Sequence, residues 1–317
     1  MARTTILVRE GFYTTNRARL TEVAPDVDFV PFGDRDDMLS KLPRAHALYG
    51  GSPREDVLES CDLLRWVHMS SAGVDRYYSR ELAARGVTLT RGSGAYGVPI
   101  SEHVLAMMLA FTRGLPQYIR QQTRREWHRT ATISEISGKV LGVYGMGDIG
   151  SDLARKAHAL GMRVYGLARR DREAPPYVEA LWTPDRLDDL LAASDFLAAC
   201  APLTNATRGR FGAREFAVMK DTAYFFNIGR GAVAVQADLE AALSAGEIAG
   251  AGLDVTDPEP LPEDSPLWDM ENVILTPHVS GGSDGTPDRV TEIVLENVRR
   301  FAAGEPLLNV VDPEHGY

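Results

Sequence analysis

Cysteine is scarce in this sequence: Cys61 and Cys200 are the two cysteines among 317 residues. Two cysteines so far apart offer neither the disulfide framework of a small secreted protein nor the paired ligands of a zinc site. We therefore expect no metal centre and a reducing compartment, which points to a cytoplasmic protein.

Long apolar runs and an excess of positive charge are also lacking. The apolar stretch near the N-terminus is interrupted by Arg9 and Glu10. No stretch approaches the roughly 20 apolar residues that span a bilayer, so we expect neither a signal peptide nor a membrane partner. Lys and Arg total 34 against 44 Asp and Glu, a formal net charge of −10 that repels polyanions on average. Nucleic acid is therefore not an expected partner, whereas a small molecule is.

What the sequence does contain is an alternation of short β-rich runs with helical segments. Its 44% hydrophobic and 25% charged residues are typical of a globular protein, and the length suits two domains of about 150 residues. The first series of β-rich runs is Thr5–Val8, Asp28–Pro31, Ala47–Gly50, Leu64–His68 and Thr88–Thr90. The second series is Lys139–Tyr144, Arg163–Ala168, Asp195–Cys200, Ala223–Asn227, Gly252–Val255 and Val273–Thr276. Strands that alternate with helices predict mostly parallel sheets with helices on both faces.

These two series predict an α/β protein of two domains. We assign residues 99–285 to a Rossmann-type doubly wound cofactor domain, because six such strands match a dinucleotide-binding sheet. Residues 1–98 and a returning segment, 286–317, are assigned to a smaller flavodoxin-like substrate-binding domain. We expect the ligand cleft between the two domains.

A long helix is predicted from Pro99 to about Arg113, with Ile100, Val104 and Phe111 on one stripe. This apolar stripe has two interpretations. It is either part of the core of the second domain or part of an interface between subunits.

A glycine-rich loop follows the first strand of the second domain. Its residues are Gly145, Met146, Gly147, Asp148, Ile149 and Gly150, and a helix comes next. In this pattern the first glycine permits a tight turn, the second lets the backbone approach a pyrophosphate, and the third allows close helix–strand packing. Free amide groups and the helix dipole then favour the anion. The loop predicts a dinucleotide site.

The next strand ends at Ala168, followed by Arg169 and Arg170. An acidic residue at that position would accept hydrogen bonds from the adenosine ribose and favour NAD. Here the small alanine leaves space, and two guanidinium groups offer forked donors for a 2′-phosphate. We predict that NADP(H) is preferred and that NAD(H) remains possible. The alternative is that both arginines are solvated residues of a surface turn.

Three titratable or charged residues follow later strands: Arg230, Glu259 and His278. In an open α/β sheet, ligands bind at the carboxyl ends of the strands. An arginine can hold a substrate carboxylate and polarise the neighbouring carbonyl, a histidine can supply a proton, and a glutamate can orient that histidine. This set predicts reduction of a 2-oxo acid by hydride transfer.

Together these segments resemble the D-isomer-specific 2-hydroxyacid dehydrogenase family, in particular its NADP-using glyoxylate/hydroxypyruvate reductase-like members. The resemblance covers nearly the whole chain and includes Pro202–Thr204, Met219–Lys220, Asn227–Gly231, Leu253–Pro262 and Thr276–His278. It implies that Arg230 binds the substrate carboxylate, that His278 paired with Glu259 is the acid/base, and that the product is an (R)-2-hydroxy acid. It also implies a homodimer formed through the cofactor domain.

The resemblance assigns further contacts. For the cofactor these are Pro202, Thr207, Ile228, Asp254 and Gly281, with Asp254 setting the nicotinamide or tuning the acid/base pair. For the substrate they are the backbone amides of Ala72 and Gly73, within the segment Ser70–Asp75.

Other functions remain to be weighed. A dehydrogenase fold can serve as a nucleotide-binding regulatory or corepressor-like scaffold without significant turnover. Phosphoglycerate, formate and phosphite dehydrogenases are neighbouring activities, although Glu259 stands where glutamine is expected for formate. We expect no appended regulatory domain. The substrate side chain stays undetermined; candidate wall residues are Tyr49, Met69, Tyr96, Trp127 and Trp268.

Overall fold

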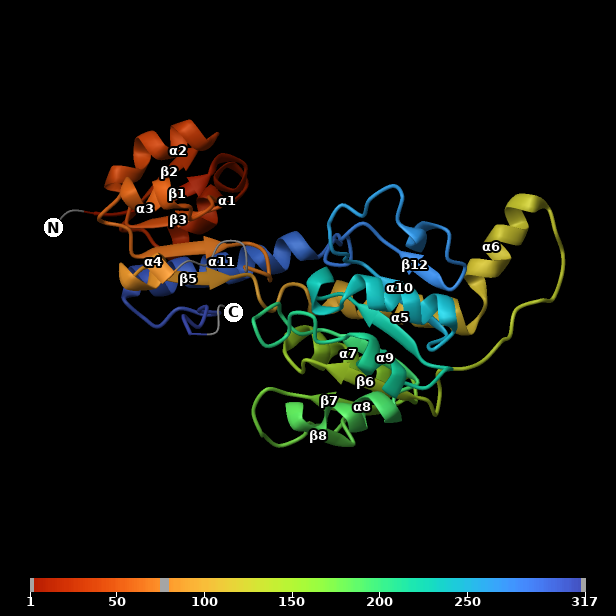
Figure 1. Cartoon of the computed structure of the whole chain (residues 1–317). Coiled ribbons are helices and arrows are strands. Elements are labelled where there is room, and N and C mark those ends of the chain that lie inside the picture. Colours follow the sequence, from red (N-terminus) through yellow and green to blue (C-terminus); the bar gives the residue numbers. More distant parts are fainter. Residues whose placement is uncertain (1–2, 75–79, 315–317) are drawn as a thin grey trace. The chain divides into compact units, whose positions relative to one another are not determined.

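The computed structural model describes residues 3–74 and 80–314 (Figure 1). The chain divides into two compact units, which are described separately. Unit 1 comprises Met1–Ala95 and Ser283–Tyr317, and unit 2 comprises Tyr96–Gly282. Each limit of unit 2 lies close to the boundary predicted from the sequence. The assignment of unit 1 to substrate binding stays a prediction.

The described residues of unit 1 form a five-stranded parallel sheet in the order β2-β1-β3-β4-β5. This is the strand order of flavodoxin-like folds. Its strands are β1 (Thr4–Arg9), β2 (Val27–Phe32), β3 (Ala47–Tyr49), β4 (Trp66–Met69) and β5 (Thr88–Arg91). Its helices are α1 (Glu10–Val23), α2 (Arg35–Lys41), α3 (Glu55–Glu59), α4 (Arg80–Ala84), α11 (Thr286–Ala303) and the short 3-10 helix η1 (Leu42–Arg44).

The last helix returns to the first unit, as the sequence predicts. Figure 1 shows α11, in blue, beside the red and orange elements of unit 1. Arg19 of α1 forms an ion pair with Glu292 of α11, with 2.8 Å between nitrogen and oxygen. Phe301 of α11 packs on the fully buried Trp66 of β4, with 5.1 Å between ring centroids. Residues more than two hundred positions apart therefore share one core.

Unit 2 contains a seven-stranded parallel sheet in the order β12-β11-β10-β9-β6-β7-β8. Its strands are β6 (Val140–Tyr144), β7 (Arg163–Leu167), β8 (Ala180–Trp182), β9 (Phe196–Ala199), β10 (Tyr224–Asn227), β11 (Gly250–Leu253) and β12 (Val273–Leu275). Its α-helices are α5 (Gly97–Thr112), α6 (Leu115–Arg124), α7 (Asp148–Ala159), α8 (Leu187–Ala193), α9 (Ala213–Val218) and α10 (Gln236–Ala245). Its 3-10 helices are η2 (Pro184–Arg186), η3 (Gly231–Val233) and η4 (Pro266–Trp268).

The sheet of unit 2 is doubly wound, because the chain runs outward from β6 in both directions. The predicted α/β class with a Rossmann-type domain is confirmed. One strand escapes prediction from the sequence. β8 has three half-buried residues after a long loop, too few to show a β pattern.

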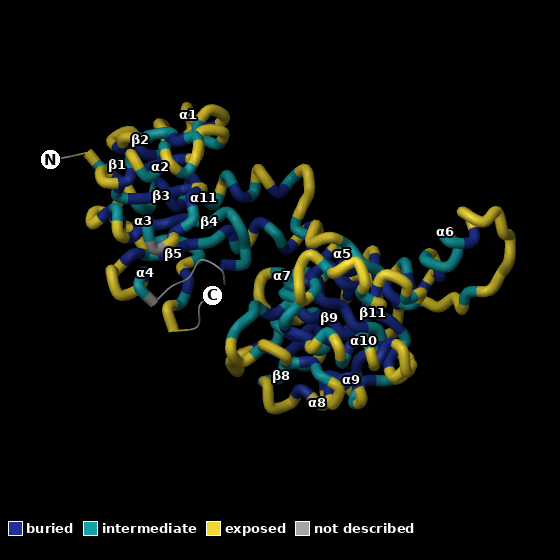
Figure 2. Tube along the Cα trace, turned by 45° about the horizontal axis from the view of Figure 1, so that its top comes forward, coloured by how far each residue is buried: buried dark blue, intermediate teal, exposed yellow. Residues whose placement is uncertain are grey.

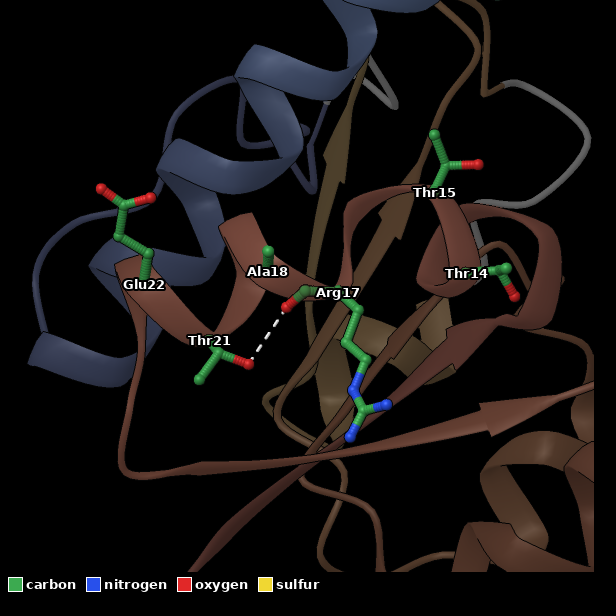
Figure 3. A pocket seen from close by; sticks show the side chains of 6 residues that line it. All are labelled: Thr14, Thr15, Arg17, Ala18, Thr21 and Glu22. Carbon is green, nitrogen blue, oxygen red and sulfur yellow. Dashed lines mark hydrogen bonds between the residues drawn. The ribbon is translucent and has the colours of Figure 1, made fainter.

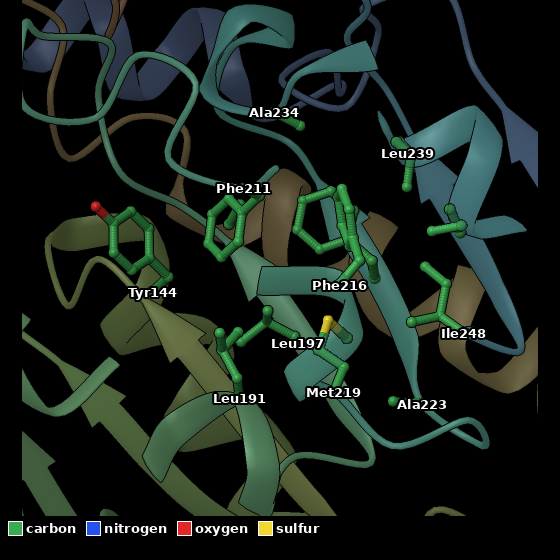
Figure 4. Packing of buried hydrophobic residues seen from close by; sticks show 14 of the residues in the cluster. Tyr144, Leu191, Leu197, Phe211, Phe216, Met219, Ala223, Ala234, Leu239 and Ile248 are labelled. Carbon is green, nitrogen blue, oxygen red and sulfur yellow. The ribbon is translucent and has the colours of Figure 1, made fainter. Parts of the chain in front are cut away.

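Apolar side chains fill both faces of this sheet. On one face, Phe211, Phe216 and Phe225 are fully buried, and Phe225 lies 5.1 Å and 5.4 Å from the other two rings (Figure 4). Figure 2 shows the central strand β9 as a buried band. The core therefore holds the strand ends, where the predicted site residues lie, in a rigid frame.

The apolar stripe of α5 belongs to the core of unit 2. Ile100, Val104, Met108 and Phe111 are all buried in one cluster with residues of α7 and the sheet. The first interpretation of this stripe is therefore correct, and the stripe itself is not available to a second subunit.

Candidate active site

The predicted catalytic residues follow three adjacent strands. In the parallel register, Asn227 at the end of β10 pairs with Leu253 at the end of β11, which pairs with Leu275 at the end of β12. Arg230 and His278 lie three residues beyond their strands, so both lie at the carboxyl edge of the sheet of unit 2. This edge is where an open α/β sheet binds its ligands.

The three glycines of the loop after β6 have three different environments. A Cβ atom on Gly145, whose φ is +104°, would lie 2.6 Å from the backbone nitrogen of Ala201. A Cβ on Gly150 would lie 2.2 Å from the carbonyl oxygen of Gly145 and would separate α7 from the sheet. A Cβ on Gly147 would meet no atom within 4 Å. The first and third glycines thus serve packing, and the second faces open space at the N-terminus of α7, where a pyrophosphate can approach the backbone.

The glycine loop is tied to the end of β7. The amides of Gly145 and Met146 both donate to the carbonyl oxygen of Leu167, at 3.0 and 3.1 Å. Ala168 comes next and is buried, whereas Arg169 and Arg170 are exposed. Arg172 donates to the carbonyl oxygen of Met146. The predicted phosphate loop and the predicted 2′-phosphate loop are therefore neighbours.

The loop after β9 lies at the point where the strand order reverses. Thr207 donates from its hydroxyl to the carbonyl oxygen of Pro202 at 2.7 Å and accepts from the amide of Thr204 at 2.8 Å, which closes this loop on itself. Nearby, Ile228 is buried, and a Cβ on Gly229 would lie 2.7 Å from the carbonyl oxygen of Ala201. Burial raises the pKa of the Cys200 thiol in this region to about 12, so the thiol stays protonated and is no nucleophile at neutral pH.

Arg230 is half-buried and held by its own loop. Its guanidinium donates to the carbonyl oxygen of Gly229 at 2.8 Å, and its backbone carbonyl accepts from the side chain of Asn227 at 3.0 Å. A Cβ on Gly231 would lie 1.9 Å from the carbonyl oxygen of Thr256, so this loop packs directly on the one after β11. An arginine fixed in this way can present a forked pair of donors to a carboxylate.

Glu259 and His278 form the predicted pair. Nδ1 of His278 lies 2.5 Å from Oε1 of Glu259, although the two residues are nineteen positions apart. The histidine side chain is 44% exposed and that of the glutamate 28%, so the pair is accessible to a ligand. Because Nδ1 faces the carboxylate, Nε2 is the ring nitrogen placed to exchange a proton with a substrate.

Asp254 follows β11 directly and has a fully buried carboxylate. Oδ1 accepts from the Thr276 hydroxyl at 2.6 Å and from the amide of Val279 at 2.9 Å, and Oδ2 accepts from the amide of Ser280 at 3.0 Å. Its backbone carbonyl accepts from the amide of His278 at 2.9 Å. Gly281, another predicted cofactor contact, follows Ser280 in the chain and packs against Tyr96. The contacts of Asp254 thus hold the loop that carries His278.

The predicted substrate amides belong to unit 1. The carbonyl oxygen of Ala72 accepts from Arg91 at 3.0 Å and that of Gly73 accepts from the Ser71 hydroxyl at 2.8 Å. Within residues 3–74 and 80–314, no acceptor is recorded for the amides of Ala72 and Gly73, which fits a loop that offers N–H groups to an anion. Asp75, the last residue of the predicted segment, lies outside the described residues.

The candidate wall residues differ in their exposure. Tyr49 of unit 1 is buried, and its hydroxyl lies 3.1 Å from that of Ser70. Trp268 is 55% exposed, and Trp127 is 95% exposed and contributes to no wall within its own unit.

A shallow hollow runs along the outer surface of α1 (Figure 3). It is lined by Thr14, Thr15, Arg17, Ala18, Thr21 and Glu22, none of which is a predicted site residue. The hydroxyl of Thr21 is used within the helix, where it donates to the carbonyl oxygen of Arg17 at 3.0 Å. This hollow carries no chemistry of the kind found at the strand ends.

Across the described part of the chain, no helix is long and apolar enough to cross a membrane.

Sequence reasoning missed one residue that contacts the loop bearing His278. Nε2 of His103, on α5, lies 3.0 Å from the hydroxyl oxygen of Thr276. His103 stands three residues after Ile100 and four before Met107, on the same stripe that packs into the core. A polar residue on an otherwise apolar stripe is the signal that could have drawn attention to it.

Known proteins define the class to which this site belongs. Residues 105–280 match the family model described as D-isomer specific 2-hydroxyacid dehydrogenase, NAD binding domain. A glyoxylate reductase of Korarchaeum cryptofilum is 36% identical over 82% of this chain and 79% of its own length. Glyoxylate/hydroxypyruvate reductase B of Salmonella gallinarum is 36% identical over 85% of each chain.

A solved structure agrees with these relatives. The NADPH-dependent glyoxylate/hydroxypyruvate reductase of Sinorhizobium meliloti, in complex with NADP and sulfate, matches with a TM-score of 0.84 and 31% identity. The match covers 99% of this chain and 100% of that one. The chain therefore belongs to the D-isomer specific 2-hydroxyacid dehydrogenase family. The predicted family and the predicted NAD(P)-dependent oxidoreductase class are confirmed.

Proposed function

We propose that this protein reduces a small 2-oxo acid of the glyoxylate or hydroxypyruvate type to the (R)-2-hydroxy acid with NADPH. The observation that carries the proposal is the Glu259–His278 pair, with Nδ1 and Oε1 2.5 Å apart, at the same strand-end edge as Arg230 and the glycine loop. The similar proteins from Korarchaeum and Salmonella are named for reduction of these acids. These names favour an enzyme over the alternative of a nucleotide-binding regulatory scaffold without significant turnover.

The residues present fit a bound dinucleotide. Open space at Gly147 and the amide-rich N-terminus of α7 suit a pyrophosphate, and bound nicotinamide would supply the hydride. Arg230 binds the substrate carboxylate and draws electron density from the neighbouring carbonyl group. Glu259 orients the imidazole of His278 through Nδ1, and Nε2 holds the proton that is given to the carbonyl oxygen. The amides of Ala72 and Gly73 are proposed as further carboxylate donors.

The preference for NADPH is proposed from the residues at the end of β7. Ala168 offers no carboxylate to a ribose 2′-hydroxyl, and Arg169 and Arg170 are exposed beside the glycine loop. The Sinorhizobium protein is described as NADPH-dependent, which supports the same choice. Guanidinium groups at this point recognise a phosphate through charge-assisted hydrogen bonds.

Initial rates with NADPH and NADH across glyoxylate, hydroxypyruvate, pyruvate and phenylpyruvate test the proposal. We expect turnover with NADPH, and a double Arg169→Ala, Arg170→Ala variant should raise the KM for NADPH but not for NADH. Each lost charge-assisted bond is worth roughly 1.5–3 kcal/mol, about 10- to 150-fold. Arg186→Ala, which removes an exposed arginine elsewhere in unit 2, is the matched control. Equal KM changes for both cofactors would end the assignment of the arginines, and absence of turnover would end the proposed activity.

The homodimer implied by the resemblance is also proposed, with α6 and the segment after it as the contact surface. Figures 1 and 2 show this segment extending from unit 2, largely exposed. Apolar side chains there are exposed, namely Leu115 at 46%, Ile119 at 59%, Trp127 at 95% and Ile133 at 44%. Such side chains gathered on one projecting segment are typical of an interaction surface. Sedimentation velocity should give a dimer that Ile119→Asp with Trp127→Ala dissociates; a monomeric parent protein would contradict this.

A further inference from the structure

The starting observation is the buried carboxylate of Asp254. Its side chain is fully excluded from solvent, and its recorded hydrogen-bond donors are the Thr276 hydroxyl and the amides of Val279 and Ser280. A buried carboxylate is costly unless donors surround it. Thr276 lies two residues before His278, and Val279 and Ser280 follow it directly. The carboxylate of Asp254 therefore holds the loop on both sides of His278.

The Thr276 hydroxyl has one proton for two neighbours. Its oxygen lies 2.6 Å from Oδ1 of Asp254 and 3.0 Å from Nε2 of His103. A hydroxyl donates one hydrogen bond and accepts others, and an ionised carboxylate can only accept. The proton of Thr276 therefore points to Asp254, and Thr276 accepts from His103. It follows that Nε2 of His103 carries a proton.

His103 is well placed for this single task. It belongs to α5, which is anchored in the core through Val104 and Met107. Its side chain is 22% exposed, and Nε2 lies 4.0 Å from Oδ1 of Asp254, too far for a direct hydrogen bond. The histidine thus reaches the carboxylate through the threonine hydroxyl alone.

We propose that His103 and Thr276 are positioning residues for the reaction: a rigid helix donates through the Thr276 hydroxyl to Asp254, which holds the loop that bears His278. This inference rests on the proposed function, since it names residues that align the proposed proton donor. The chain of bonds joins α5, the end of β12 and the end of β11. Misplacement of a catalytic group by about 1 Å can cost roughly 100-fold in rate, so alignment at this level matters.

The first test does not depend on activity. Hydrogen exchange at the amides of Val279 and Ser280 reports whether Asp254 still holds them. Thr276→Val should speed this exchange by roughly 10- to 150-fold, the loss of one hydrogen bond to a charged group. His103→Leu should speed it by roughly 2- to 13-fold, because the bond that it removes goes to a neutral hydroxyl. His103→Gln should restore slow exchange, because the glutamine amide can donate near the position of Nε2. Glu102→Gln is the matched control and should leave exchange unchanged. It changes the residue before His103 on α5, whose exposed side chain forms an ion pair with Lys156.

Kinetics provide the second test. We expect kcat to fall at least about tenfold in Thr276→Val and by a smaller factor in His103→Leu, with little change in the dissociation constant for NADPH in either variant. It should recover in His103→Gln. The double variant should lose no more than Thr276→Val alone, because that substitution already removes the bond from His103 together with the bond to Asp254. Unchanged exchange and unchanged kcat in His103→Leu would overturn the inference while the proposed function stands. If the parent protein shows no turnover, the proposed function fails, and the exchange measurement still decides whether the anchor exists.

Discussion

The glycine loop permits a prediction in which two similar substitutions have opposite effects. Gly147→Ala places a methyl group where no atom lies within 4 Å, so the protein should fold normally. The loss of stability should stay within about 1 kcal/mol, the difference between glycine and alanine at a helix N-cap. The methyl group nevertheless occupies the space through which a pyrophosphate would approach the backbone. Loss of one charge-assisted bond there predicts roughly 10- to 150-fold weaker NADPH binding.

Gly150→Ala should do the reverse. Its methyl group would lie 2.2 Å from the carbonyl oxygen of Gly145 and 2.9 Å from the side chain of Val143, so α7 must move away from β6. Overpacking of this kind costs about 1–3 kcal/mol, which exceeds the gain of about 1 kcal/mol from alanine in a helix.

Urea unfolding and fluorescence titration with NADPH separate the two effects. We expect Gly147→Ala to unfold at a urea concentration close to that of the parent and to lose affinity for NADPH. Gly150→Ala should unfold at a clearly lower urea concentration. Parent-like NADPH binding by Gly147→Ala would show that the dinucleotide does not use this loop. A Gly150→Ala protein as stable as the parent would refute the packing argument.

Four further substitutions test other parts of the molecule. His278→Ala should lower kcat by a factor of about 10²–10⁴ with NADPH binding retained, and parent turnover in this variant would contradict the acid/base assignment. Glu259→Gln should lower kcat by a smaller factor, because the amide oxygen still accepts a hydrogen bond from Nδ1 of His278. Burial lowers the pKa of His68 to about 4, below its unfolded value near 6.5, so the unfolded chain binds the proton first and stability falls as pH drops from about 6.5 towards 4. From pH 7 to pH 5 this difference lowers the free energy of unfolding by about 2 kcal/mol. Urea titration should find this loss in the parent and not in His68→Gln; equal pH dependence in both would disprove it. Phe225→Ala should cost about 3–5 kcal/mol in the same assay, because its ring is fully buried between Phe211 and Phe216, and a loss below 1 kcal/mol would mean that the site collapses freely.

Local pattern in the sequence was enough for much of this protein. The alternation of β-rich and helical runs is visible in the periodicity of apolar side chains, which depends only on residues close together in the sequence. This pattern predicted the two sheets and the returning helix α11. The glycine loop could be identified because its three glycines stand at a fixed spacing directly after a β-rich run and before a helical one, which is a local pattern. Arg230, Glu259 and His278 could be named because each follows a strand, and parallel strands bring such positions to one edge.

Tertiary structure alone decided the remaining features. The three residues of β8 carry too little pattern to be recognised, and only pairing with β7 makes them a strand. The stripe on α5 could not be assigned to core or interface until its neighbours in the sheet and in α7 were known, because an apolar face has the same period against either partner. The bond between His103 and Thr276 spans 173 positions, and no local pattern carries such a contact. Sequence period specifies which face of an element is buried, but the atoms that meet across that face are decided by packing of the whole unit.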